Sequence, residues 1–351
     1  MNDSLKRDFN SICDDFYNWD LFRNKTFLVT GATGLLGSLF IKSLLYTSDI
    51  HKLDARVIAV VRDLEKGHKV FEEYNQIEFL VHDFSLDEPF TCEANVDYII
   101  HTAAVTVSRE MVNHPVENIK VSLYGTMRIL DFAVKANPEC LLYLSSMEAY
   151  GQMSVTDHLV EEHELGRIDL SSVRSCYPEG KRMCECICKS YSNQHGIRVV
   201  VARLAQTFGP GISKEENRVF AQFAKSAIRG EDIVLHTKGE SEGNYVYTAD
   251  AIKAMYLLLD KGTSGEVYNV VNEKTHMSIS SMAHMVADEI ANGNIDVVFD
   301  LPVSTTNSIY AADTKMHLSS RKLQELGWEP SVNLLDMYKN MIRYAGEEEL
   351  W

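Results

Sequence analysis

The stretch Thr30-Gly31-Ala32-Thr33-Gly34-Leu35-Leu36-Gly37 decides the fold that this sequence predicts. A short apolar run at residues 25–30 leads into it, and a helical pattern at residues 35–46 follows. Glycines at this spacing allow a tight turn in which the backbone approaches a pyrophosphate, and the helix N-terminus adds N–H donors. We therefore expect the turn to hold a dinucleotide; a glycine-rich packing site is the alternative. The contacts would come from Gly31, Thr33, Gly34, Leu35, Leu36 and Gly37.

Apolar runs and helical patterns alternate after this turn. Strands are expected at residues 25–30, 56–61, 77–81, 96–101, 141–145 and 197–204, and long helices at 116–136 and 181–195. Strands that read as continuous apolar runs between helices are typical of a parallel sheet covered on both faces. The sequence thus predicts an α/β fold with a doubly wound parallel sheet, the Rossmann arrangement.

The rhythm changes after residue 210, where short strands (232–236 and 267–271) mix with helices (216–229, 249–260 and 279–291). We expect residues 25–210 to form the dinucleotide-binding domain. Residues 211–351 would form mainly a smaller substrate-binding domain, interleaved with the first. Residues 1–24 are expected to add an amphipathic helix packed on the main domain. Its apolar positions are Leu5, Phe9, Ile12, Cys13 and Phe16.

The composition argues against several classes of protein. The 351 residues carry a net charge of −16 and are 45% hydrophobic, which suits a globular protein but would repel nucleic-acid phosphates. No run reaches the roughly 18 apolar residues of a membrane span, and the charged first residues lack a signal-peptide core. Four of the seven cysteines crowd between residues 176 and 188 on a predicted helix, without the spacing of a metal site, so reduced thiols are expected. We expect a cytoplasmic protein with no nucleic-acid, membrane or metal partner.

The residues after the second strand bear on the choice of cofactor. Arg62 stands where an arginine suits the 2′-phosphate of NADP, whereas the neighbouring Asp63 leaves NAD open. The alternative for Arg62 is a solvated surface charge. Further cofactor contacts are expected where the third and fourth strands end, and His101 is either part of this set or a satisfied strand-end histidine. These contacts are Asp83, Phe84, Thr102, Ala103 and Ala104.

Chemistry is indicated by Tyr177-Pro-Glu-Gly-Lys181, because residues four apart on a helix share a face. An ammonium beside a phenol stabilises the phenolate, so the phenol can act as a base nearer neutral pH. Ser146 follows the strand at 141–145, where a hydroxyl is well placed to hydrogen-bond a substrate oxygen. A phenolate next to a nicotinamide predicts oxidation of an alcohol.

Five motifs together carry a family resemblance: TGATGLLG (30–37), HTAA (101–104), SSMEAYG (145–151), YPEGK (177–181) and FGP (208–210). With them, the chain from about residue 25 to 345 resembles the extended short-chain dehydrogenase/reductase family. Within that family it is similar to nucleotide-sugar epimerases, dehydratases and decarboxylases. The run RSCYPEGKR at 174–182 is similar to that of UDP-glucuronate decarboxylases.

The resemblance implies transient oxidation of a nucleotide-diphosphate sugar, at C4, by bound NAD or NADP. Ser146, Tyr177 and Lys181 would be catalytic, and Glu148 would move a proton if dehydration or decarboxylation follows rather than epimerisation. A homodimer built on the helices at 116–136 and 181–195 is also implied. Apolar residues available to that interface, or to the core, are Val121, Ile129, Leu130, Ile187 and Tyr191. Substrate contacts are expected from Val105, Gln206, Arg218 and Lys238.

Four positions depart from the family's usual residues: Ser122, Gln206, Gly211 and Gly243. Gly243 replaces an arginine that often grips the sugar diphosphate, and losing that clamp removes a strong contact. Arg218 and Lys238 are the candidates to compensate. Two other functions stay open, namely an NADPH-dependent reductase of the same superfamily and a non-catalytic nucleotide-binding relative.

Overall fold

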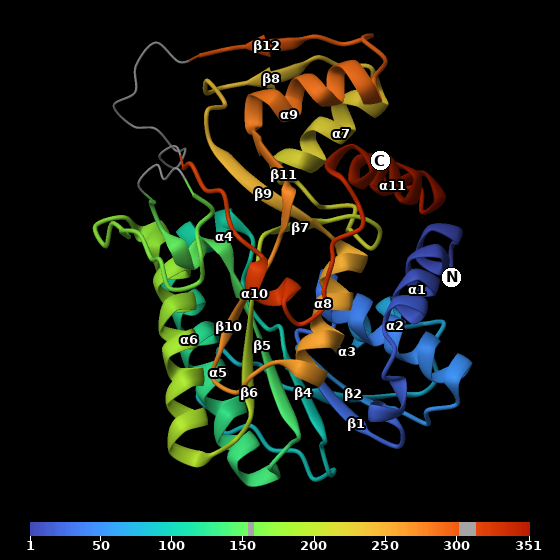
Figure 1. The fold of residues 1–351 in the computed structure, drawn as a ribbon, viewed down its shortest axis with the longest axis vertical. Coiled ribbons are helices and arrows are strands. Elements are labelled where there is room, and N and C mark those ends of the chain that lie inside the picture. The colour runs from blue at the N-terminus through green and yellow to red at the C-terminus, as the bar shows by residue number, and fades with distance from the viewer. Residues whose placement is uncertain (154–157, 302–313) are drawn as a thin grey trace.

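A seven-stranded sheet forms the large lobe of the protein, in a computed structural model that describes residues 1–153, 158–301 and 314–351 (Figure 1). All its strand pairs are parallel, and the order is β10-β6-β5-β4-β1-β2-β3. The strands are β1 (Thr26–Thr30), β2 (Arg56–Val61), β3 (Ile77–Val81), β4 (Tyr98–His101), β5 (Cys140–Ser146), β6 (Val199–Leu204) and β10 (Val267–Val270). The order reverses at β1, as in a doubly wound sheet. The predicted fold class is confirmed.

Helices cover both faces of this sheet, and the inner strands β4 and β6 are buried at every position, whereas the edge strand β3 is partly exposed. One hydrophobic cluster joins the sheet to α2 (Leu35–His51) and α8 (Thr248–Lys261). The other joins it to α5 (Pro115–Ala136) and α6 (Cys176–His195). Helix α6 begins five residues earlier than predicted, which places Tyr177 in its first turn. The remaining helices of this lobe are α3 (Leu64–Val70) and α4 (Ser108–Asn113).

Residues 1–24 form helix α1 (Asp3–Asp15) and a 3₁₀ turn, Trp19–Phe22. The apolar face predicted for α1 is buried, including Phe9 and Ile12 at 1% exposure each. The helix contacts α2, α8 and α11 (Leu334–Glu347), which brings the two ends of the chain together (Figure 1).

The small lobe lies at the carboxyl ends of the main strands (Figure 1). Its three-stranded sheet has the order β11-β9-β7, with β9 antiparallel to β11 and parallel to β7. A second pair, β8 and β12, is parallel. The elements are β7 (Gln206–Phe208), β8 (Ile233–Leu235), β9 (Glu242–Tyr247), β11 (Asn272–Ser278), β12 (Val297–Phe299), α7 (Val219–Arg229) and α9 (Ile279–Met285). The short helix α10 (Arg321–Gln324) contacts β10 of the large sheet instead. The helix predicted at 279–291 is interrupted, because residues Val286–Ile290 form a π-helical turn.

Between the lobes the chain crosses more than once: α8 and β10 follow small-lobe strands but pack on or join the large sheet. All seven cysteines are free thiols, with Cys184 and Cys188 buried on α6 and Cys186 exposed. Across residues 1–153, 158–301 and 314–351 there is no helix of the length and apolarity that crossing a membrane requires. The same residues hold no group of three potential metal ligands.

Candidate active site

The glycine turn is closed in by the ends of β1 and β4. Gly31 has φ +63°, and a Cβ there would lie 2.5 Å from Thr102 Oγ1 and 2.8 Å from the Ala103 nitrogen. A Cβ on Gly37 would lie 2.5 Å from the Gly31 oxygen, so both positions require glycine. Gly34 is the N-cap of α2, and its N–H donates to the Gly31 oxygen at 2.9 Å. The turn therefore presents a helix N-terminus and bare backbone, which fits a pyrophosphate.

Hydrogen bonds fasten the β1 and β4 ends to each other. Thr102 Oγ1 donates to the Thr30 oxygen at 2.7 Å, and Thr30 Oγ1 lies 2.7 Å from His101 Nδ1. Burial, with a smaller effect of Lys181, lowers the pKa of His101 to about 3. His101 is therefore a neutral, hydrogen-bonded core residue. Thr102 and Ala103 line the turn through this packing.

The predicted adenosine contacts lie beyond β2 and β3. Arg62 is exposed, while Asp63 caps α3 by accepting from the Lys66 N–H at 3.0 Å. Burial opposes ionisation of Asp83, but hydrogen bonds from Ser85 and the charge of Arg62 outweigh it and lower the Asp83 pKa. Phe84 is buried under Gly125. The Phe84 side chain is therefore a core residue, its oxygen accepts from Arg128 at 3.2 Å, and contact of its backbone with a cofactor stays a prediction.

Tyr177, Lys181 and Ser146 come together at the carboxyl end of β5. Tyr177 and Lys181 are both buried on one face of α6. Burial raises the pKa of Tyr177 to about 12, and a hydrogen bond with Ser146 acts in the opposite direction. Lys181 Nζ lies 5.8 Å from the centre of the Tyr177 ring and donates to the Leu144 oxygen at 2.7 Å.

The expected ammonium–phenol contact therefore takes a different form. Lys181 is held by the β5 backbone, at 4.8 Å from the Tyr143 ring centre, and burial lowers its pKa. Its ammonium lies over the phenol ring, 5.8 Å from the ring centre. The Ser146 side chain acts to lower the Tyr177 pKa.

Glu148 pairs with Arg174, a residue of the RSCYPEGKR run for which the sequence predicted no role. Arg174 Nη2 donates to both Glu148 carboxylate oxygens, at 2.9 and 2.7 Å. The Arg174 guanidinium carbon also lies 5.5 Å from the Tyr177 ring centre. Its position three residues before Tyr177, at the start of α6, is the sequence signal that could have found it.

The predicted substrate residues occupy different surroundings. Arg218 bonds to Glu216 at 2.7 Å, and its charge is the smallest of the causes that act on the Tyr177 pKa, which it lowers. Gln206 and Lys238 are exposed, on β7 and in the loop after β8. Val105 is half-buried, and its oxygen accepts from Asn118 at 3.3 Å. Contact with a sugar nucleotide stays a prediction for all four.

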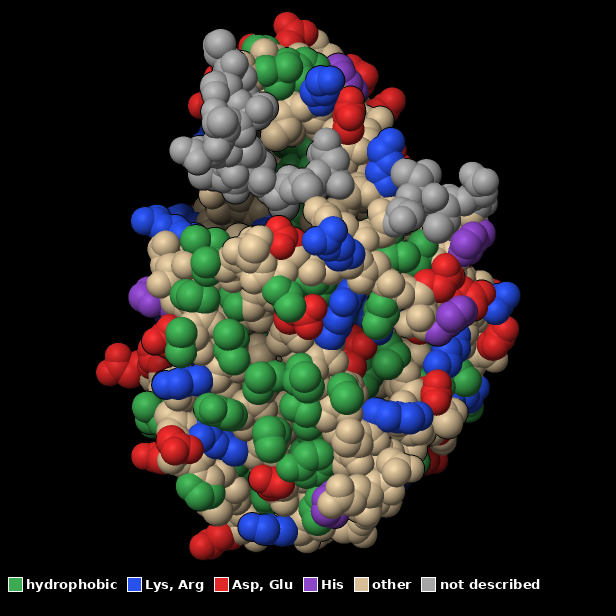
Figure 2. Space-filling view, turned by 90° about the vertical axis from the view of Figure 1, so that its left-hand side faces the viewer, with side chains coloured by type: hydrophobic (Ala, Val, Ile, Leu, Met, Phe, Trp, Pro, Cys, Tyr) green, Lys and Arg blue, Asp and Glu red, His purple; other side chains and the backbone are tan. Residues whose placement is uncertain are grey.

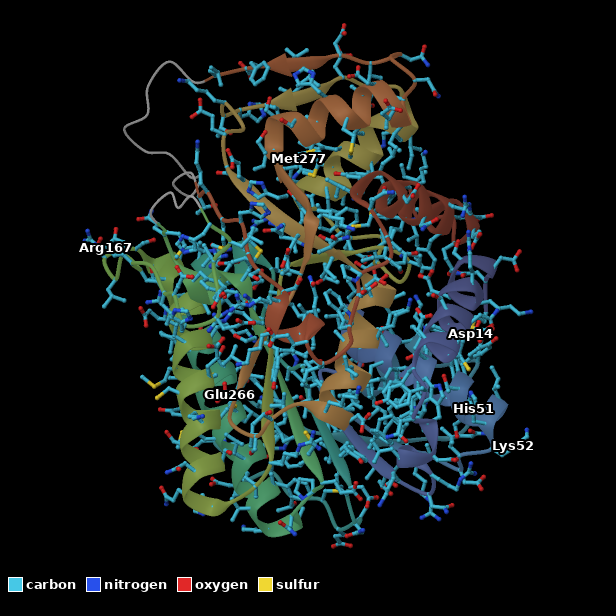
Figure 3. The ribbon with its side chains drawn as sticks, in the orientation of Figure 1. Asp14, His51, Lys52, Arg167, Glu266 and Met277 are labelled. Atoms are coloured by element: carbon cyan, nitrogen blue, oxygen red, sulfur yellow. The ribbon has the colours of Figure 1, made fainter. Side chains whose placement is uncertain are left out.

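The two glycines that replace arginines differ from each other. Gly211 has φ +96°, and a Cβ there would lie 2.8 Å from a Leu39 methyl on α2, so this position excludes an arginine. Gly243 has an ordinary φ, and its Cβ would meet only the Met147 methyl, at 3.5 Å. It pairs in register with Met277 of β11, in the small lobe above the main sheet (Figure 3). Gly243 thus tolerates a Cβ, which would make an ordinary contact with Met147, the residue between Ser146 and Glu148.

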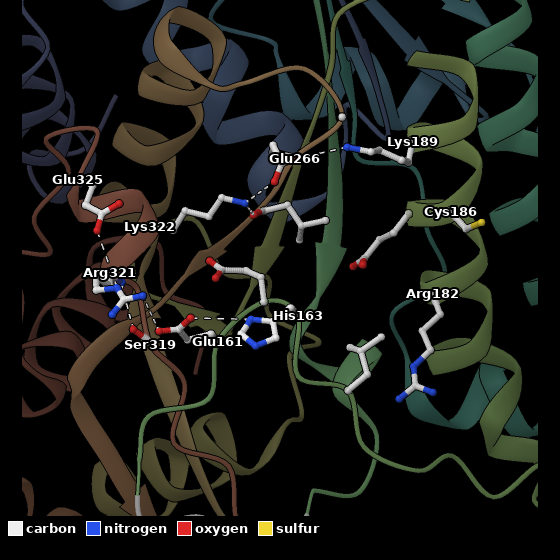
Figure 4. Close-up of a pocket in the computed structure, with 15 residues that line it drawn as sticks. Glu161, His163, Arg182, Cys186, Lys189, Glu266, Ser319, Arg321, Lys322 and Glu325 are labelled. Carbon is white, nitrogen blue, oxygen red and sulfur yellow. Dashed lines mark hydrogen bonds and ion pairs between the residues drawn. The ribbon is translucent and has the colours of Figure 1, made fainter. Parts of the chain in front are cut away.

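A hollow of about 530 Å³ lies away from Tyr177, between α6, β10 and α10 (Figure 4). Its charged residues pair with each other, as in Lys322–Glu266–Lys189 and Arg321–Glu161. Size alone would favour it as the ligand site. The catalytic groups and the glycine turn favour the carboxyl end of the sheet instead.

Comparison with known proteins identifies the family of this chain. The model of the "NAD dependent epimerase/dehydratase family" matches residues 27–271. The chain belongs to the NAD-dependent epimerase/dehydratase family. It is 30% identical to a UDP-glucuronic acid decarboxylase from Arabidopsis thaliana, over 89% of this chain and 86% of that protein. It is 29% identical to another from Xenopus tropicalis, over 92% and 73%.

Solved structures in this family share the fold. The UDP-glucuronic acid 4-epimerase from Bacillus cereus, in complex with UDP-glucuronic acid and NAD, has a TM-score of 0.74 at 20% identity. The alignment covers 93% of this chain and all of that one. The predicted family and its α/β architecture are thereby confirmed.

Proposed function

We propose that this chain is an NAD-dependent enzyme that transiently oxidises a hydroxyl, at C4, of a nucleoside diphosphate sugar. The observation that carries the proposal is the buried pair of Tyr177 and Lys181, which the hydrogen bond from Lys181 to the Leu144 oxygen fixes at the carboxyl end of β5, the strand that ends at Ser146. That edge of the sheet also holds the glycine turn. The named relatives act on UDP-sugars, which supports the substrate class.

Tyr177 would act as the base, taking a proton from the sugar hydroxyl while Ser146 orients both oxygens. Bound NAD would supply the hydride acceptor, held by Gly31, Gly34 and the backbone at Ala103. Tyr177 must lose its proton in an environment that raises its pKa to about 12. The positive charge of oxidised NAD, added to those of Lys181 and Arg218, would favour that loss.

The ketone formed at C4 would acidify the neighbouring carbon, so three outcomes follow: reduction from the other face, loss of water, or loss of carbon dioxide. Glu148 would move a proton in the last two. The decarboxylase relatives and the 174–182 run support the third outcome. The lack of a side chain at Gly243 distinguishes this chain from relatives with an arginine there, so the sugar itself is part of the test.

The test is incubation of the purified protein with UDP-, CDP-, GDP- and dTDP-sugars, including UDP-glucuronate. Mass spectrometry would detect loss of water or carbon dioxide, and NMR would detect epimers of unchanged mass. Turnover without added reductant is expected, because hydride returns to the product. Failure of every sugar nucleotide would refute the proposal. Activity only with NADPH consumption would instead support the reductase that Arg62 suits.

An apolar surface supports the homodimer that the helices suggested. The named candidates Val121, Ile129 and Leu130 are core residues, at 7% exposure or less. Other large apolar side chains are exposed on or next to α4, α5 and α6: Val107, Val112, Val116, Ile119, Tyr124, Met127 and Met183. Figure 2 views this side of the molecule and shows hydrophobic side chains gathered on the large lobe. We propose that the protein dimerises through this surface, which sedimentation velocity would check.

We also propose a cytoplasmic location, which the free thiols support.

A further inference from the structure

Arg174 bridges the two groups that would handle protons. Its Nη2 holds both oxygens of Glu148, and its guanidinium lies 5.5 Å from the Tyr177 ring centre. The pair is half-exposed, at 28% for Arg174 and 42% for Glu148. Nη1 is buried and lacks a hydrogen-bond partner within the described parts of the chain. The Arg174–Glu148 pair therefore keeps an unused N–H donor beside Tyr177. It differs in this from the structural pair of Arg203 and Glu185, in which Nε and Nη2 of Arg203 both donate to the Glu185 carboxylate.

The backbone around Arg174 is fixed by local hydrogen bonds. Asp169 organises the preceding loop, because its carboxylate accepts from the Ser171 N–H at 3.0 Å and its carbonyl from Ser175 Oγ at 2.6 Å. Arg174 lies in a 3₁₀ turn, Val173–Ser175, that runs directly into α6. Its side chain is therefore delivered to the Glu148–Tyr177 space by the same helix start that carries Tyr177.

The charges facing Tyr177 come from several elements. Glu148, after β5, raises the Tyr177 pKa, whereas Arg174 and Arg218 lower it. Lys181, one turn along α6, lies over the ring. Removing Arg174 would leave the Glu148 charge unbalanced next to the phenol. Removing both would cancel much of the change, because the two charges oppose each other.

We propose that Arg174 is a positioning residue, which holds the Glu148 carboxylate beside Tyr177 and balances the charge that Glu148 places there. The role rests on Tyr177 being the base of the proposed function. Arg174 acts through Glu148 and Tyr177 rather than by touching the reacting carbon. The role therefore predicts coupling between Arg174 and Glu148, which independent contributions would not give.

The test reads the Tyr177 phenol directly and needs no substrate. The protein is labelled with ¹³C at tyrosine Cζ and saturated with NAD, and the Tyr177 signal is assigned by its loss in Tyr177→Phe. At one fixed alkaline pH, Arg174→Gln should lower the phenolate-to-phenol ratio about tenfold. Glu148→Gln should raise that ratio. Adding Arg174→Gln to Glu148→Gln should lower the ratio by clearly less than tenfold, because Arg174 then has no carboxylate to hold or balance. Arg174→Lys, which keeps the charge, should lie between Arg174→Gln and wild type.

The matched control is Arg167→Gln, which removes the same charge from the loop near α6 (Figure 3) without touching Glu148. It should leave the ratio unchanged. If Arg174→Gln changes the phenolate-to-phenol ratio equally with Glu148 present or replaced, the coupling is refuted. If Arg174→Gln does not change that ratio at all, the proposed role is refuted. If Arg174→Gln does not fold, Arg174→Lys decides: a wild-type ratio in that variant contradicts the need for the bidentate clamp. Coupling without turnover of any sugar nucleotide would leave the role standing and refute the proposed function alone.

Discussion

The two ends of the candidate site are built differently. At the cofactor end, Gly31 and Gly37 are walled in by backbone at 2.5–2.8 Å from any added Cβ, so the shape is set by the main chain. At the end proposed to hold the sugar, a Cβ on Gly243 would meet only the Met147 side chain, at 3.5 Å, so the shape there is set by side chains. The first end tolerates almost no change, while the second can change its ligand without rebuilding the fold.

The largest effect should separate the two ends outright. Tyr177→Phe removes the base but touches no part of the glycine turn, so activity should fall roughly 10²–10⁴-fold. Affinity for NAD, measured by calorimetry, should stay within about twofold because the cofactor end is intact. Activity above a tenth of wild type would show that another group is the base.

A pH effect is expected beneath the sugar end, where Tyr247 of β9 donates to Asp8 of α1 at 2.9 Å. Burial raises the pKa of Asp8 from 3.8 to about 7. The folded state therefore holds this proton more tightly than the unfolded state. Stability is fully present below about pH 4 and declines up to about pH 7, by on the order of 2–4 kcal/mol.

Denaturant unfolding across this range, for wild type and Asp8→Asn, checks the Asp8 effect. The variant should flatten the decline, although Asp250, whose pKa burial also raises, would leave a residual slope. An unchanged slope in Asp8→Asn would assign the effect elsewhere.

The cofactor end can be probed by separating backbone strain from crowding. Gly31→Ala should weaken NAD binding and cost about 1–3 kcal/mol of unfolding free energy, because its Cβ meets Thr102 and Ala103. Gly293→Ala is the matched control: its φ of +69° is similar, but nothing lies within 4 Å of the new Cβ. It should cost less and leave NAD binding unchanged. Equal losses of unfolding free energy in Gly31→Ala and Gly293→Ala would mean that the crowding around Gly31 contributes nothing.

The smallest stability effect is expected at the sugar end. Gly243→Ala places a Cβ 3.5 Å from the Met147 methyl, an ordinary contact, so unfolding free energy should change by about 0.5 kcal/mol or less. The KM for the sugar nucleotide should nevertheless change, and Gly243→Arg should change it more. A large loss of stability in Gly243→Ala would show that the space is filled by structure rather than by substrate.

The same contrast explains what the sequence could predict. Glycine spacing and apolar periodicity are local signals, so the strands 56–61 and 77–81 were placed to the residue. The Tyr177–Lys181 face followed from helical geometry for the same reason. The bond of Lys181 to the Leu144 oxygen and the bridge from Arg174 to Glu148 join distant segments. No periodicity reports such contacts, so charge balance at the sugar end required the folded structure.

The edge strand β10 also affects how the protein is made. β10 pairs with β6, but the chain builds β7, β8, β9 and α8 in between. During synthesis one edge of strand β6, residues 199–204, therefore stays without its β10 partner until Val267–Val270 have left the ribosome. An open apolar edge is a template for pairing with another nascent chain. Slower translation should lengthen that wait, and yield of soluble protein should depend on temperature and on chaperones that cover the edge.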